Sequence, residues 1–98
     1  MPFVKRGDLV DFDTRVGVVL EVHSRSEPHM GSQLVMDGNP ITCSAHYVAL
    51  VLIEERRVRY KFDVRFEWNH STCRIDTITA RRVGTHDPWI RAQIQSLG

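Results

Sequence analysis

Hydrophobic and polar residues alternate along much of this chain with the two-residue period of a β-strand. The clearest alternation covers residues 60–68, where apolar and charged side chains take turns without interruption. The apolar members are Tyr60, Phe62, Val64, Phe66 and Trp68, and the charged members are Lys61, Asp63, Arg65 and Glu67. Since neighbouring side chains of a strand point to opposite faces, this segment predicts a strand with one aromatic face and one charged face.

Shorter apolar runs predict five brief strands before residue 54. They cover residues 9–12, 16–23, 33–36, 41–43 and 48–53. Asp37-Gly38 predicts a tight hairpin, because both central residues of such a turn need positive φ. Residues 44–47 are expected to form a single helical turn, and the strand at 48–53 is expected to be fully buried.

The second of these strands has a distinctive face pattern. Alternation predicts one buried face for its aliphatic side chains, which are Val16, Val18, Leu20 and Val22. Gly17 is expected where a neighbouring strand approaches closely or the strand bends.

The C-terminal part predicts a returning strand and a helix. Residues 73–83 would pair with 60–68, and a slip in their alternation between Ile75 and Ile78 predicts a β-bulge. Asp87 suits a helix N-cap and Pro88 the first helical position. Ile90, Ile94 and Leu97 follow the spacing i, i+4 and i+7, which predicts a short amphipathic helix.

These elements predict a mainly β protein of three parts. Residues 4–53 would form a small SH3-like β-barrel, because five short strands, a long loop, a tight hairpin and one helical turn follow one another in that order. Residues 54–83 would form a charged connector and a long β-hairpin, and residues 84–98 a C-terminal helical tail. A two-stranded ribbon is marginal alone, so its aromatic face must cover the barrel or a partner.

Three motifs carry a family resemblance. They are Lys-x-Gly-Asp-Leu-Val at residues 5–10, Gly-Val-Val-Leu-Glu-Val at 17–22 and Leu-Val-Met-Asp-Gly at 34–38. With Leu50, they resemble the short SH3-like proteins of tailed bacteriophages, especially those infecting cyanobacteria. The resemblance covers residues 4–53. It implies a non-enzymatic structural or assembly role in a virion, as a capsid decoration, neck or tail component, and it supplies no catalytic residues.

Composition is that of one folded domain: 42% of the 98 residues are hydrophobic and 26% are charged. The first residues lack the apolar core of a signal peptide, and the longest apolar run, 47–53, is too short to cross a bilayer. The two cysteines are therefore expected as reduced thiols. The expected location is the virion or host cytoplasm, without secretion and without a membrane partner.

Apolar residues are the first candidates for contact with protein subunits of a larger assembly, the protein itself included. The partner-binding candidates are Tyr60, Phe62, Phe66, Trp68, Trp89, Ile90, Ile94 and Leu97. The structural alternative is that the first four belong to the core and that the helix packs on its own barrel.

Nucleic-acid binding is the alternative function. Charge is uneven, because four basic residues face six acidic ones in residues 1–52 while nine face six in residues 53–98. An Arg-rich ribbon over residues 56–82 would supply phosphate contacts, with Arg56, Arg57, Arg59 and Lys61 as candidates. Against it, Asp63 and Glu67 alternate with the cations, which predicts cross-strand ion pairs, and the aromatic side chains point away from the cations.

Two paired spacings suggest a metal site. Cys43-x-x-His46 and His70-x-x-Cys73 together offer four ligand types that zinc prefers. The alternative is two ordinary thiols and two surface imidazoles. No other cofactor is indicated.

Catalytic motifs are absent from the sequence, with no nucleophile elbow, phosphate loop or His-Glu-x-x-His. Asp11 and Asp13 flank a turn and Glu54 and Glu55 lie in a connector, so solvated charge explains both carboxylate pairs. We therefore expect no enzyme.

Overall fold

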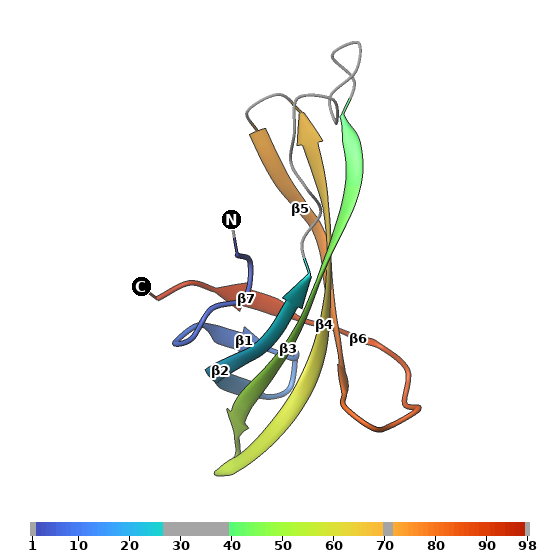
Figure 1. Cartoon of the computed structure of the whole chain (residues 1–98). Coiled ribbons are helices and arrows are strands. Elements are labelled where there is room, and N and C mark those ends of the chain that lie inside the picture. Colours follow the sequence, from blue (N-terminus) through green and yellow to red (C-terminus); the bar gives the residue numbers. More distant parts are fainter. Residues whose placement is uncertain (1, 27–39, 70–71, 98) are drawn as a thin grey trace.

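One antiparallel sheet organises the whole protein. The computed structural model describes residues 2–26, 40–69 and 72–97. The strands are β1 (Leu9–Asp11), β2 (Val16–Ser26), β3 (Ile41–Ile53), β4 (Arg56–Asn69), β5 (Thr72–Arg82), β6 (Ile90–Arg91) and β7 (Gln93–Gln95). They lie in the order β6-β5-β4-β3-β2-β1-β7 and curl into a nearly closed barrel (Figure 1). The mainly β prediction is confirmed, and all three predicted parts contribute strands to this one sheet.

The predicted C-terminal helix is wrong, because residues 90–95 close the barrel as strands. β6 pairs with β5, β7 pairs with β1, and the N–H of Ala92 between them donates to the carbonyl of Ile78 at 2.8 Å. A three-turn helix is marginal on its own, whereas two neighbouring strand edges offer hydrogen bonds to the backbone. Ile90, Ala92 and Ile94 also fit a two-residue period, and Ala92 is buried.

Residues 41–53 form a single strand, so the predicted helical turn at 44–47 is wrong. The inward side chains are Cys43, Ala45, Tyr47, Ala49, Val51 and Ile53, and each residue between them is more exposed. The segment 48–53 is accordingly half-buried, not fully buried as predicted. Pairing with β2 and β4 decides the conformation here over local preference.

The predicted buried face of β2 is also wrong at its start. Val16 is 58% exposed, whereas Val19 is 1% exposed and lies in the core. The register with β3 shifts between Val19 and Glu21 and again beyond Val22, and each extra residue exchanges the two faces. The expectation for Gly17 is confirmed, since a Cβ there would lie 2.6 Å from Cγ1 of Ile53.

The prediction for β4 and β5 is confirmed. Tyr60, Phe62 and Phe66 lie in the core, on the face opposite the charged residues. The bulge is present too, because Arg65 pairs with Thr77 while Phe66 pairs with Ile75, which leaves Asp76 as the extra residue. The third strand at 33–36 and the Asp37-Gly38 turn lie outside the described residues.

The segment before β1 is held by a turn around Gly7 and Asp8. Gly7 has a φ of +90°, and its N–H donates to the carbonyl of Val19. Asp8 is 2% exposed and its Oδ2 accepts the N–H of Lys5 at 2.9 Å. This turn directs Phe3 onto the sheet, where its ring centroid lies 4.8 Å from that of Phe66.

The strands β3, β4 and β5 are longer than the segments of β2 and β6 that pair with them. β2 pairs with β3 only as far as His46, and β6 pairs with β5 only at Thr79 and Ala80. Among the described residues, the remaining lengths of β3, β4 and β5 project beyond the barrel as an arm of three strands (Figure 1). We call residues 41–45, 64–69 and 72–77 the arm, and the other described strand residues the barrel end.

Candidate functional site

Four basic side chains gather on the outer face of the barrel end. Arg57, Arg59 and Lys61 occupy successive outward positions of β4, two residues or about 7 Å apart. Arg81 of β5 lies directly opposite Lys61 in the antiparallel register. We call Arg57, Arg59, Lys61 and Arg81 the basic stripe.

Within the described ranges, no carboxylate neutralises the basic stripe. Across residues 2–26, 40–69 and 72–97, no ion pair includes any of its four cations. Glu54 and Glu55 are close in sequence, but they form the exposed β3–β4 turn with φ values of 50° and 64°. Like charges directly opposite each other on a sheet are destabilising by a few tenths of a kcal/mol to about 1 kcal/mol. Lys61 and Arg81 form such a pair.

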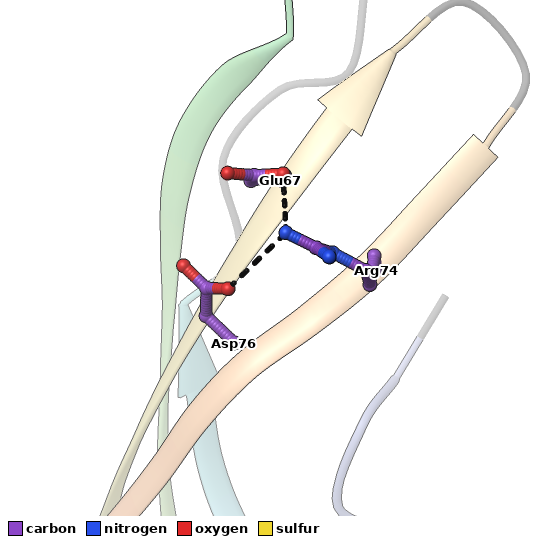
Figure 2. A network of polar contacts seen from close by, with 3 residues as sticks. All are labelled: Glu67, Arg74 and Asp76. Atoms are coloured by element: carbon purple, nitrogen blue, oxygen red, sulfur yellow. Dashed lines mark hydrogen bonds and ion pairs between the residues drawn. The ribbon is translucent and has the colours of Figure 1, made fainter.

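The arm shows the opposite arrangement on the same outer face. Arg74 places one guanidinium nitrogen 2.9 Å from Glu67 and 3.7 Å from Asp76 (Figure 2). At the junction with the barrel end, Asp63 lies 3.7 Å from Arg65 and 3.6 Å from His46. The cross-strand ion pair predicted from the sequence is therefore confirmed for Glu67. The cation beside Asp63, Arg65, belongs to the same strand, and Lys61 has no carboxylate partner in the described part of the chain.

An indole borders the basic stripe. The guanidinium carbon of Arg81 lies 4.8 Å from the ring centroid of Trp89, a cation–π contact that leaves Trp89 40% exposed. The Nε of Arg81 is buried and has no hydrogen-bond partner among the described residues. Arg81 is thus held in place by the ring while part of its hydrogen-bonding capacity is unused.

An aliphatic row borders the stripe on its other side. Val48, Leu50 and Leu52 of β3 face outward opposite Lys61, Arg59 and Arg57, respectively. Val48 and Leu50 are half-buried, and Leu52 is 38% exposed. Each cation of β4 therefore has one aliphatic neighbour on β3.

The predicted partner-binding residues are divided between core and surface. Tyr60, Phe62 and Phe66 are in the core and cannot meet a partner in this fold. Trp68, on the inner face of the arm, and Ile94 of β7 are half-buried against that core. The exposed members are Trp89, Ile90 and Leu97, at 40%, 39% and 58%.

The predicted nucleic-acid residues are also divided. Arg57, Arg59 and Lys61 share the outer face, but Arg56 is opposite the inward-facing Ile53 and belongs to the other side of the strand. Sequence reasoning did not single out Arg81 among the ribbon's cations and assigned Trp89 to a helix. The hairpin register, counted from the turn through the bulge, was the signal that could have paired Arg81 with Lys61.

The proposed metal ligands do not converge. Cys43 points inward, while His46 points outward, is exposed, and faces Asp63. A spacing of three residues places two side chains on opposite faces of a strand, so the strand conformation of residues 41–53 separates Cys43 from His46. His70 lies outside the described residues, and among the rest no group of three or more potential ligands gathers.

The two thiols share the inner face of the arm. Cys43 is buried and Cys73 half-buried. Desolvation, and secondarily the nearby Cys43 thiol, raises the pKa of Cys73 above its ordinary value of 9.0. Cys73 is therefore a poorly activated nucleophile. The carboxylate pair at the β1–β2 turn is structural, because Oδ1 of Asp11 accepts the N–H of Asp13 at 2.8 Å.

Comparisons with protein-family models, curated proteins and solved structures find no match to this chain. In the described ranges, no helix has the length and apolar character needed to cross a membrane.

Proposed function

We propose that this protein is a non-enzymatic nucleic-acid-binding module and that the basic stripe is its phosphate-binding surface. The observation that carries the proposal is the unneutralised pair of Lys61 and Arg81, directly opposite each other between two strands. Such a pair lowers stability in isolation, and a polyanion bound across it removes the repulsion.

The other cations extend this surface along β4. Arg57 and Arg59 continue from Lys61 at regular intervals, so a phosphate backbone running along the strand meets one cation after another. Guanidinium groups suit phosphate oxygens because they donate two parallel hydrogen bonds. Binding of this kind releases counterions and is therefore strongly salt-dependent.

The test compares two double variants with the same change in net charge. Arg59→Gln with Lys61→Gln removes two cations from the basic stripe, while Arg65→Gln with Arg74→Gln removes two that are already ion-paired. Affinity for a labelled oligonucleotide is measured by fluorescence anisotropy between 50 and 200 mM salt, a range in which phosphate contacts are strongly weakened.

We expect the stripe variant to lose at least about tenfold in affinity and to reduce the slope of log K against log salt by about two. The variant with Arg65→Gln and Arg74→Gln should keep most of the affinity and most of the salt dependence. Equal losses in the two variants would show that net charge alone attracts the nucleic acid, and absence of binding at low salt would overturn the proposal.

Assembly with protein subunits is the second candidate, and exposed apolar residues favour it. Ile75, Ile90 and Ile94 line a groove between β5 and the β1–β2 turn. Leu97 lies further along the chain and is 58% exposed. The SH3-like architecture and the role in a phage virion belong to this candidate and rest on the motifs of residues 5–38. Size-exclusion chromatography with light scattering tests it: an oligomer that Ile90→Ser with Leu97→Ser dissociates would support it, and a monomer at all concentrations would contradict self-assembly.

A further inference from the structure

We infer that the basic stripe binds single-stranded nucleic acid, with unpaired bases resting on the side chains that border it. The inference rests on the proposed function and specifies its ligand. Trp89 lies along one side of the stripe, and the aliphatic row lies along its other side. The indole and the aliphatic side chains can contact unpaired bases, whereas the bases of a duplex are stacked inside the double helix.

Trp89 is placed to stack on a base. Arg81 lies over its ring at 4.8 Å, yet the residue remains 40% exposed. The contact with Arg81 holds the indole next to a phosphate-binding cation, so a nucleotide whose phosphate meets Arg81 has its base within reach of the ring. Stacking on an aromatic side chain contributes about tenfold in affinity per base and depends little on sequence.

The aliphatic row gives the other bases an apolar surface. Its register with β4 is one to one, since Leu52, Leu50 and Val48 stand opposite Arg57, Arg59 and Lys61. A strand whose phosphates follow the cations can therefore lay its bases over the aliphatic side chains. The cations recur about every 7 Å, a spacing similar to that of successive phosphates in an extended single strand.

The shape of this surface disfavours a duplex. The stripe lies within the sheet, with β3 and β2 on one side of β4 and β5 on the other. Four strands span roughly 14 Å between the outermost strand axes, wider than the roughly 12 Å major groove. The stripe can therefore touch only the outer phosphates of a duplex, where Trp89 and the aliphatic row contribute nothing.

The test uses the full chain and three fluorescein-labelled probes with matched phosphate numbers. They are a twelve-nucleotide thymidine strand (a probe length of about one small-barrel site), a blunt duplex and an abasic strand. Affinities are measured by anisotropy for the native protein, for Trp89→Ala and for Trp89→Phe, with circular dichroism to check that each variant folds. We expect tighter binding of the thymidine strand than of the duplex or the abasic strand. Trp89→Ala should weaken binding of the thymidine strand about tenfold, and Trp89→Phe should keep most of the native affinity. Neither substitution should change the affinity for the abasic strand.

The outcomes separate the two claims. Equal affinity for the thymidine and abasic strands, or a duplex bound as tightly as the single strand, overturns the single-strand inference and leaves the basic stripe as a phosphate-binding surface. Absence of binding to all three probes overturns the proposed function as well. If Trp89→Ala is unfolded, the duplex and abasic comparisons on the native protein still decide the question.

Discussion

The barrel end and the arm share the strands β3, β4 and β5, but their charged side chains are arranged in opposite ways on the outer face. On the outer face of the arm, Arg74 lies between Glu67 and Asp76 in ion-pair contact. On the outer face of the barrel end, Lys61 and Arg81 face each other without a carboxylate among the described residues. Both regions are antiparallel strands, so the difference lies in the choice of residues.

The two charge patterns have different consequences for stability and for the attraction of anions. Ion pairs on an exposed sheet contribute little to stability, but they remove local repulsion and leave their charges neutralised. Two cations opposite each other lower the stability of the fold and attract anions. The arm therefore has the charge pattern of a solvated surface, and the barrel end has unneutralised cations where we propose that nucleic acid binds.

The inner faces differ only toward the tip of the arm, because Val64 and Phe66 at its base are as buried as Phe62. Phe62 in the barrel end is 1% exposed, with its ring centroid 6.5 Å from that of Phe12. Trp68 in the arm is only partly buried. We expect Phe62→Ala to lower the free energy of unfolding by about 3–5 kcal/mol. Trp68→Ala should cost about half as much, because less of its apolar surface is removed from water.

Urea denaturation followed by circular dichroism measures both values. A loss at Trp68 equal to that at Phe62 would show that the tip of the arm is as tightly packed as the barrel end, which would contradict the difference between the two inner faces.

Close packing of the barrel end gives the next largest effect. A Cβ at Gly17 would lie 2.6 Å from Cγ1 of both Val51 and Ile53, which are themselves buried. Gly17→Ala should therefore lower the free energy of unfolding by about 1–3 kcal/mol. Val16→Ala is the matched control, since Val16 is 58% exposed and should change stability by less than about 0.5 kcal/mol. Similar midpoints for the two variants in urea would contradict the close approach.

The paired segments 60–68 and 73–82 of β4 and β5 were predictable because their pattern is local. Uninterrupted alternation from Tyr60 to Trp68 defines both faces, and the slip between Ile75 and Ile78 marks the bulge. The pairing of Asn69 with Thr72 and one extra residue place Lys61 opposite Arg81, so this pair follows from counting along the hairpin.

The closing strands were not predictable from local pattern. Ile90 and Ile94 are four residues apart, so they share a face both on a helix and on a strand, whose side chains repeat every two residues. Only the hydrogen-bonding edges of β1 and β5 decide between the two conformations. The same limit applies to Cys43 and His46, which share a face on a helix and lie on opposite faces of a strand. Trp89 could be placed beside Arg81 only once the closing strand was known.

Charge exchange gives effects of opposite sign in the two regions. Lys61→Glu replaces the repulsion with Arg81 by attraction and should raise the free energy of unfolding by about 0.2–1 kcal/mol. Glu67→Lys sets two cations opposite each other at Arg74 and should lower it by a similar amount. Both shifts should shrink at 1 M salt, where the screening length is only about 3 Å. Thermal denaturation at low and high salt measures them, and a loss of stability in Lys61→Glu would contradict the repulsion.

The smallest effect concerns the thiol on the inner face of the arm. Burial raises the pKa of Cys73 above 9.0, with a further contribution from the nearby Cys43. The folded protein therefore holds the thiol proton more tightly than the unfolded chain, so stability falls as pH rises from about the ordinary value through the raised pKa. Alkylation by iodoacetamide, followed by mass spectrometry across pH, should show a higher midpoint for Cys73 in the native protein than in urea. Cys43→Ala should lower that midpoint by removing the second cause, whereas identical midpoints in native and unfolded protein would contradict the buried position of this thiol.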